Sequence, residues 1–275
     1  VDRITHTLSG AWLAGAFLLM SVGAYYLVKK KYPEFSKRSI TIGLGIAIFA
    51  SLFQLFTGHQ SATTISKTQP AKLAAFEAHY DSSAVADLYL FGWVDEEKEQ
   101  VIGIAVPAML TYLLHYDVTT PVIGLRAFAK EDRPPVNIVF QFYHLMVAIG
   151  MTLIGIALLG GFLLWRKRLF DTTWFLKLLV PAVLLPQIGN QVGWYSAEIG
   201  RQPWLVYNLL RTSEGLSKTV KAEQVWFSLI LFTLIYALLF VLFVYLLNEK
   251  IQKGPLEADL VPSQYEKQRT VLDRK

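Results

Sequence analysis

The sequence predicts an all-α fold, a polytopic bundle of transmembrane helices with an ordered extracytoplasmic loop. Hydrophobic residues make up 53% of the 275 positions and charged residues only 17%, whereas soluble domains carry about 25% charged residues. Aromatic residues reach 13%, as expected where several helix ends lie at membrane interfaces. Five long apolar runs stand out, at 8–28, 39–56, 138–165, 174–195 and 225–247.

These runs have the length that a membrane-spanning helix needs. About 20 residues, each rising about 1.5 Å, cross the hydrocarbon core of a bilayer. The run at 39–56 is the shortest, and the run at 138–165 is long enough to tilt or to protrude. Because hydrocarbon offers no hydrogen-bond partner to the backbone, all five spanning segments must be helices.

Basic residues in the short connections set the expected orientation. The connection at 29–38 reads KKKYPEFSKR and the one at 166–168 reads RKR, and connections of this kind stay in the cytoplasm. The N-terminus and the segments 58–137 and 196–224 are then extracytoplasmic. We expect four parts: two transmembrane helices in 1–57, the outer loop 58–137, three transmembrane helices in 138–247, and a cytoplasmic tail at 248–275.

The outer loop has a pattern typical of an ordered segment. Residues 70–77, PAKLAAFE, place a proline before good helix formers and predict a helix start. Residues 101–114, VIGIAVPAMLTYLL, are apolar but too few to span, and they contain Pro107. They predict an interfacial or re-entrant helix. Ordered loops of this length are usually functional.

Composition excludes several chemistries. The chain has no cysteine, so disulfides, thiolate ligation of iron–sulfur clusters and a C-x-x-C-H haem attachment are excluded. The basic residues lie in short loops and form no nucleic-acid surface, so we expect no nucleic-acid partner. The chain begins with Val1 and not Met, and we expect it to be a piece of a longer protein.

Three polar or sulfur-containing side chains fall at the outer ends of different spans. His6 lies at the entrance of the first, Met146 about two turns into the third, and Glu198 at the end of the fourth. A His/Met pair is an axial ligand set for low-spin haem iron. Each residue also has an ordinary structural interpretation, which spacing alone favours: an interfacial histidine, a packing methionine, and a carboxylate paired with Arg201 one turn away.

Helical angles separate two other pairs of candidates. His144 is two residues before Met146, about 200° around the helix, so the two cannot bind one iron. Lys72 and Glu77 are five residues apart, about 140° around. They either touch different parts of a docked ligand or subunit, or belong to a solvated helix face. His59, at the outer end of the second span, is a weaker ligand candidate.

The fourth span is unusually polar. It contains Gln187, Asn190 and Gln191, followed by Trp194. Amides inside a membrane helix must face protein, water or a cofactor. This face either lines a cofactor cavity or holds helices together.

Three motifs, in order, resemble subunit I of the cytochrome bd-type quinol oxidases. Residues 193–204, GWYSAEIGRQPW, are similar to the family's GWxxAExGRQPW signature. Residues 72–78, KLAAFEA, resemble the KxAAxEA stretch of its quinol loop, and residues 120–125, TPVIGL, resemble its TPVxGL segment. The resemblance covers essentially the whole chain, which looks like the last five of the family's nine transmembrane helices, with a quinol loop of the short type.

The resemblance implies roles for the matching positions. His6 and Met146 would be the axial ligands of a low-spin haem b. Glu198 would ligate, or lie against, the iron of a high-spin haem b. Lys72 and Glu77 would take part in quinol oxidation at the outer face.

Three further positions would lie beside the haems. Arg201 would neighbour haem propionates or Glu198, and Trp194, in the same motif, would contribute to cofactor binding. His144 falls where some members have an arginine near the low-spin haem, so a charge there would depend on pH.

The implied function is that of a haem-binding subunit of a respiratory quinol:oxygen oxidoreductase in a bacterial or archaeal cytoplasmic membrane. Its partners would be subunit II, a small single-helix subunit as a further candidate, menaquinol or ubiquinol, oxygen and the lipid bilayer. The family's first four helices carry the histidine ligand of the oxygen-binding haem, which is haem d or a third haem b. Without them, we expect this chain alone to be inactive.

Two alternatives remain open. The first is a membrane di-haem cytochrome that passes quinol electrons to another acceptor. The second is a haem-free transporter subunit that uses the polar fourth helix as a pathway.

Overall fold

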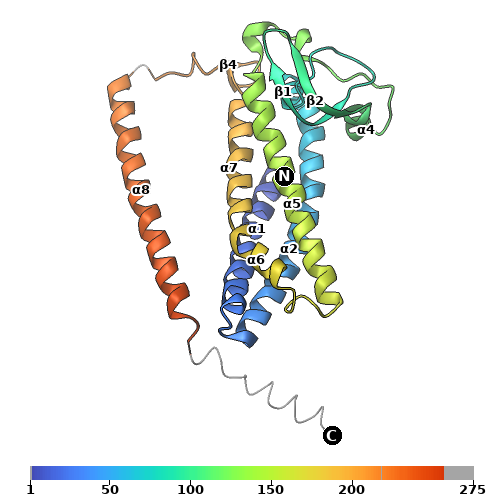
Figure 1. The fold of residues 1–275 in the computed structure, drawn as a ribbon. Helices are drawn as coiled ribbons and strands as arrows, with labels where there is room; N and C mark the ends of the chain where they lie inside the picture. The colour runs from blue at the N-terminus through green and yellow to red at the C-terminus, as the bar shows by residue number, and fades with distance from the viewer. Residues whose placement is uncertain (1, 218, 257–275) are drawn as a thin grey trace.

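A computed structural model describes residues 2–217 and 219–256. Five helical spans form the membrane part, and the fourth of them is divided into two helices (Figure 1). Their bounds are α1 Asp2–Val28, α2 Pro33–Thr68, α5 Val136–Trp165, α6 Thr173–Ala182, α7 Leu184–Ile199 and α8 Ala222–Lys253. The prediction of a polytopic helical membrane protein is confirmed.

Two of the spans differ most from the predicted runs, α2 in its length and the fourth span in its continuity. Helix α2 continues to Thr68, well past the predicted end at 56, and Thr64 there donates a hydrogen bond of 2.6 Å to Asp2 of α1. The fourth span breaks between α6 and α7. Pro186 has no N–H to donate to the carbonyl of Ala182, one turn earlier, and its ring disfavours a straight helix there.

A small head lies at one end of the bundle and is only partly helical (Figure 1). Its elements are α3 Pro70–Phe76, β1 Leu88–Asp95, β2 Gln100–Val106, α4 Met109–His115 and the short 3-10 turns Leu125–Ala127 and Lys130–Asp132. The short strands β3 Trp204–Val206 and β4 Leu210–Arg211 follow α7. The helix start predicted at Pro70 is confirmed.

The prediction of one apolar helix over 101–114 is wrong. Strand β2 takes up the first half of this stretch and pairs antiparallel with β1, and α4 takes up the second half. Pro107 separates them because it has no N–H for either a ladder or a helix. The hairpin turn begins at Asp95, whose carboxylate accepts the N–H groups of Glu97 and Lys98 at 3.2 Å and 3.1 Å.

Helices α1, α2, α5 and α6 share the main apolar core. Gly23 of α1 and Gly43 of α2 let these two helices approach closely. A Cβ at Gly43 would lie 2.8 Å from Met20 Cγ and 2.9 Å from the carbonyl oxygen of Ala16. Small residues at a membrane-helix contact allow dispersion contacts that larger side chains would prevent.

Gly43→Val should therefore destabilise the bundle by about 1–3 kcal/mol, because the new methyl groups meet backbone as well as a side chain. Gly45→Val is the matched control, since a Cβ at Gly45 meets nothing within 4 Å. Thermal denaturation of the purified protein in detergent measures both variants. Equal melting temperatures would contradict the close contact.

Helix α8 stands apart from the other helices in Figure 1. None of the described residues of α8 is buried against the other helices. It meets α1 near its C-terminal end, where the Tyr26 hydroxyl donates to the carbonyl of Ile251 at 2.6 Å. Of the predicted tail at 248–275, residues up to Lys253 continue α8, and 257–275 lie outside the described residues.

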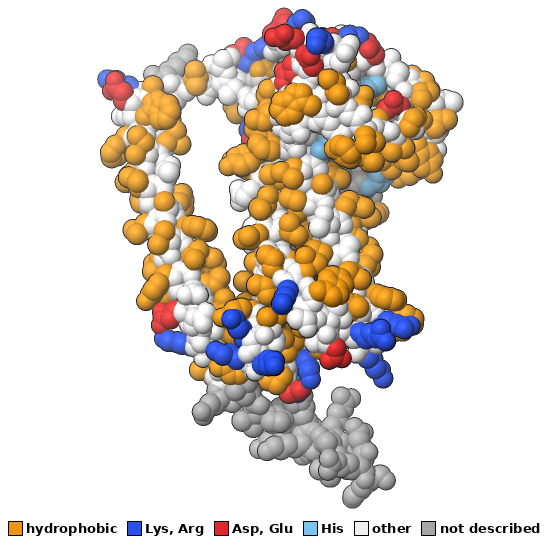
Figure 2. Space-filling view, viewed as in Figure 1, with side chains coloured by type: hydrophobic (Ala, Val, Ile, Leu, Met, Phe, Trp, Pro, Cys, Tyr) orange, Lys and Arg blue, Asp and Glu red, His pale blue; other side chains and the backbone are white. Residues whose placement is uncertain are grey.

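Charged side chains lie mainly at the two ends of the molecule (Figure 2). Lys and Arg side chains gather at the end opposite the head, and the flank between the ends is largely apolar (Figure 2). The arrangement fits a multi-pass membrane protein whose basic connections lie on one side.

Candidate functional site

His6 projects from α1 toward α2. Its Nδ1 lies 3.1 Å from Thr57 Oγ1, and its Nε2 lies 3.0 Å from Gln54 Nε2. The Ser9 hydroxyl contacts Gln54 Oε1, and in this orientation of the amide the Gln54 NH₂ donates to His6 Nε2. In this arrangement Nδ1 carries the proton and Nε2 carries the lone pair. A ring nitrogen with a lone pair, opposite an anchored N–H, is the arrangement found in histidine metal ligands.

Met146 projects from α5 toward α7. A Cβ at Gly193 would lie 2.7 Å from its Sδ. His6 lies against a glycine in the same way, since a Cβ at Gly58 would be 3.3 Å from its Cε1. Both ligand candidates are therefore held where the facing helix has no side chain.

Helix α7 relates the two candidates in depth. Asn190 Nδ2 donates to the carbonyl of Gly10 on α1 at 3.3 Å. From that contact, His6 lies four residues toward the head, about 6 Å, and Gly193 three residues toward the head, about 4.5 Å. Since Met146 packs on Gly193, the imidazole and the thioether lie at comparable depth.

His144 faces a different set of neighbours from Met146. Its Nε2 lies 2.8 Å from the carbonyl oxygen of Tyr89 on β1, and its Nδ1 lies 2.9 Å from that of Phe140. The ring stacks on Phe140 at 3.9 Å between centroids. His144 thus contacts the head and Met146 contacts α7.

Glu77, just after α3, is buried against α5. Only 2% of the residue is exposed, and one carboxyl oxygen has no hydrogen-bond partner among the described residues. That oxygen lies 3.9 Å from His144 Nε2. Burial raises the pKa of Glu77 to about 8, against a smaller lowering by its hydrogen bond with Tyr143. The carboxyl is neutral at pH 7 and ionises just above it.

Lys72, on the same short helix, points to α7. Its Nζ donates to the carbonyl of Ala197 at 2.6 Å and lies 5.6 Å from the centroid of the Phe76 ring. Burial is the main cause that lowers the pKa of Lys72 to about 8, and repulsion from Arg3 adds to it. Attraction to Glu198 opposes this lowering, and repulsion from Arg201 is the smallest contribution. Helix α3 and the residue after it therefore place Lys72 against α7 and Glu77 against α5, and both residues have displaced pKa values.

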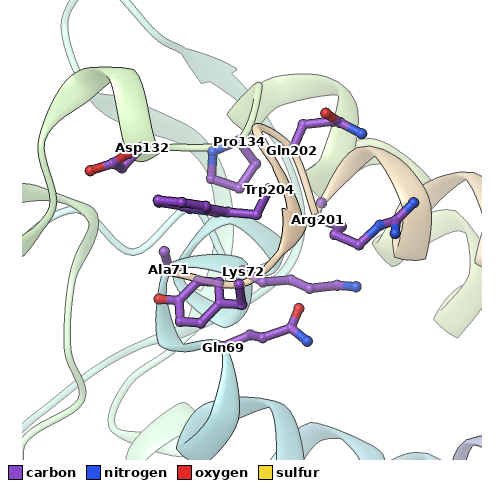
Figure 3. A pocket seen from close by; sticks show the side chains of 10 residues that line it. Gln69, Ala71, Lys72, Asp132, Pro134, Arg201, Gln202 and Trp204 are labelled. Atoms are coloured by element: carbon purple, nitrogen blue, oxygen red, sulfur yellow. The ribbon is translucent and has the colours of Figure 1, made fainter. Parts of the chain in front are cut away.

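Arg201 and Glu198 form an ion pair at the end of α7, as the structural interpretation of Glu198 expected. Arg201 Nε is buried and has no hydrogen-bond partner among the described residues. Arg201 and Lys72 line a narrow hollow together with Trp204 and Tyr207. In Figure 3 the Lys72 and Arg201 side chains extend in the same direction. The hollow has no room for a water molecule, so a ring-shaped ligand would have to displace its walls.

One face of α7 stays uncovered although it is polar. Gln187, Gln191 and Trp194 are exposed and Glu198 is half-buried, at the spacing of a single helix face. Trp194 is 59% exposed and packs against Tyr195. Exposed amides within a membrane span require a polar partner.

Sequence reasoning missed several residues that position the candidates. Gln54 and Thr57 lie about 50 positions from His6, and only folding brings α2 beside it. Polar side chains inside an apolar helix were the available signal. Tyr143, whose hydrogen bond reaches Glu77, gave no sequence signal beyond its place beside His144.

The donor set fits a haem iron better than a bare metal ion. No group of three or more His, Asp or Glu side chains in the described part of the chain could hold a metal ion. Axial ligation of haem needs only two side chains. Three features suit a haem. His6 Nε2 has a lone pair, Met146 Sδ lies opposite a glycine, and Arg201 Nε has no partner among the described residues.

Comparisons with a family model and with curated proteins agree on one family. The family model described as "Cytochrome bd terminal oxidase subunit I" matches residues 1–255. The chain is 34% identical over 260 residues to "Cytochrome bd ubiquinol oxidase subunit 1" of Bacillus subtilis (strain 168), covering 90% of this chain and 56% of the relative. It is 33% identical over 263 residues to "Putative cytochrome bd menaquinol oxidase subunit I" of the same organism, covering 93% and 58%.

A solved structure shows the same fold. The chain matches "The structure of bd oxidase from Geobacillus thermodenitrificans" with a TM-score of 0.84 and 30% identity, covering 92% of this chain and 58% of that one. The chain thus spans a little over half the length of the relatives it matches. By the extent of the family match, this chain belongs to the cytochrome bd terminal oxidase subunit I family.

Proposed function

We propose that the chain is the haem-binding and quinol-oxidising part of a respiratory quinol oxidase that reduces oxygen. The observation that carries this proposal is the position of α3. It buries Lys72 against α7 and Glu77 against α5, the helices that carry the candidate haem ligands and their contacts. Groups with strongly displaced pKa values beside such ligands are expected at a site that couples proton release to electron transfer.

His6 and Met146 would hold a low-spin haem b, and Glu198 would ligate or lie against a high-spin haem b. When bound, the haems supply one-electron acceptors of graded potential, and the His/Met set raises that of the first. Arg201 would donate its free Nε–H to a propionate, and Trp194 would pack against the cofactor from the uncovered face of α7. Gln54 would have to release His6 Nε2.

Lys72 and Glu77 would act on the two hydroxyl groups of the quinol. As a cation, Lys72 would hold a quinol oxygen by a charge-assisted hydrogen bond. As a carboxylate, Glu77 would accept a quinol proton. His144, 3.9 Å away, would favour that carboxylate when it is itself protonated.

The two roles predict a bell-shaped pH dependence of kcat/KM centred near pH 8. Glu77, with its pKa raised to about 8, must lose its proton, so the rate rises as pH approaches 8. Lys72, with its pKa lowered to about 8, must keep its proton, so the rate falls above 8. Lys72→Arg should remove the alkaline limb, because arginine stays charged. Stopped-flow oxidation of a soluble quinol by the complete complex measures the profile, and a flat profile would contradict both roles.

Partners follow from the exposed polar face of α7. A second haem-bearing segment or subunit II would cover Gln187 and Gln191, and a small single-helix subunit is a further candidate. The oxygen-reducing haem, haem d or a third haem b, would be held by a histidine outside this chain. We propose that the head lies on the extracytoplasmic side of a bacterial or archaeal cytoplasmic membrane, opposite the basic connections. Menaquinol and ubiquinol are both candidate substrates at the head.

An optical spectrum of the complete complex tests the proposal. Low-spin and high-spin haem b together would support it. Low-spin haem alone would favour a cytochrome with another electron acceptor. A folded complex without a Soret band would favour a transporter and overturn the proposal.

A further inference from the structure

The β1–β2 hairpin presents an apolar face outward. Phe91 pairs with Ile104 and Trp93 with Ile102, so these four side chains share one face, and they are 55–71% exposed. On the opposite face Val94 is buried in the core of the head. Strands that face water carry polar side chains on their outer face, and a contiguous apolar patch usually marks an interaction surface.

Helix α4 continues this apolar surface. Tyr112 and Tyr116 are 51% and 70% exposed, and Leu113 lies between them on the helix. Figure 2 shows apolar side chains over the part of the head that contains the hairpin and α4. These residues and the outer face of the hairpin are called the apolar patch below.

Contacts with α5 fix the depth of the hairpin. The backbone N–H of Asn137 donates to the Glu96 carboxylate at 2.7 Å, and Gln141 Nε2 donates to the carbonyl of Gly92 at 2.8 Å. His144, at 2.8 Å from the carbonyl oxygen of Tyr89, is the third contact. The α5 positions run over seven residues, about 10 Å along the helix. The hairpin therefore runs down α5, with its turn outermost and its base deepest.

A second measure of depth comes from α2. Lys37 and Arg38 lie in the first two turns of α2. Helix α2 begins at the end of the bundle opposite the head (Figure 1), where Lys and Arg side chains gather (Figure 2). His59 lies 21 residues beyond Arg38, about 31 Å along α2, which is close to the thickness of the hydrocarbon core. Tyr116 bonds to His59, with 2.6 Å between its hydroxyl oxygen and His59 Nε2. The C-terminal end of α4 is thus placed at the outer boundary of the hydrocarbon.

Charged residues of the hairpin lie at its outermost end, and apolar residues lie deeper. The charged side chains of the hairpin lie at its turn, where Glu99 pairs with Arg126 and Arg133. Phe91 and Ile104 lie nearer the base, between the levels of Gln141 and His144 on α5. An element that is charged at its outermost end and aromatic below it matches a membrane interface.

We propose that the apolar patch lies in the interfacial region of the lipid bilayer, on the side opposite the basic connections. The hairpin and α4 are then a monotopic element beside the transmembrane bundle, with Trp93, Tyr112 and Tyr116 at headgroup level. The proposal rests on the depth of these elements and does not depend on the proposed function.

The absence of cysteine from the chain makes a direct test simple. A nitroxide label is attached at Ile104→Cys in the complete complex, after any accessible cysteines of its other subunits have been replaced, in vesicles of phosphatidylethanolamine and phosphatidylglycerol. Power-saturation EPR compares relaxation of the label by oxygen, which concentrates in lipid, and by a water-soluble nickel chelate. Glu97→Cys, at the exposed hairpin turn, is the control, and Ile102→Cys repeats the test at a second position on the same face.

Labels at Ile104→Cys and Ile102→Cys should be relaxed more by oxygen than by nickel, and the label at Glu97→Cys should show the reverse. A label on the patch that nickel relaxes as strongly as it relaxes the turn label would place the patch in water. A label that neither agent reaches would place it under a protein partner. Either result would overturn the proposal.

Discussion

Met146→Leu is expected to convert the low-spin haem of the complete complex to a high-spin species while leaving the protein folded. Leucine has nearly the same volume as methionine but no lone pair, so it fills the space opposite Gly193 without ligating iron. The reduced-minus-oxidised optical spectrum and the EPR signal of the ferric complex measure the change. The effect should be close to complete, because one axial ligand is lost.

Met151→Leu is the matched control. Met151 lies on the same helix and is 54% exposed, so its replacement should leave the spectrum unchanged. If Met146→Leu kept the low-spin signal, another residue would be the axial ligand and Met146 would be only a packing residue.

Glu77→Gln should lower kcat for quinol oxidation by about 10²-fold or more, the usual contribution of a positioned base. Lys72→Met should lower kcat/KM, because the charge-assisted hydrogen bond to the quinol oxygen is lost. Glutamine keeps the shape of the buried side chain but cannot accept a proton, and methionine keeps its length but carries no charge. Haem content should stay normal, because neither residue is proposed as a ligand. Quinol kinetics and pigment extraction on the same preparation separate the two effects.

Exposed residues supply the controls for this pair. Glu97→Gln, on the hairpin turn, and Lys67→Met, near the end of α2, change the same side-chain types where they are exposed, and both should retain full activity. Equal rates in Glu77→Gln and Glu97→Gln would remove Glu77 from the reaction. Loss of haem in Lys72→Met would point to a structural role in holding the end of α7.

The sequence predicts the membrane helices well because hydropathy and length determine them. It underestimates α2, since the last turns are rich in Ser, Thr and Gln and are held by contacts such as Thr64 with Asp2. It misassigns 101–114, because a short apolar run does not distinguish a strand from a helix. Pro107 and the β-branched residues before it were the signal for a strand.

The site is less predictable than the fold. The interpretation of Lys72 and Glu77 as part of a solvated helix face is wrong, since the two residues are only 6% and 2% exposed. Only the fold shows that Lys72 reaches a carbonyl 125 positions away, and that Glu77 lies against α5. The lone pair on His6 Nε2 depends on Gln54, a contact between distant segments that no local pattern encodes.

A density map of the complete complex tests most directly whether His6 and Met146 hold the same iron. We predict that His6 Nε2 and Met146 Sδ would both hold one haem, with Gln54 moved away from the imidazole. A map with these two side chains on different haems, or with His6 still bonded to Gln54, would contradict the proposed haem site.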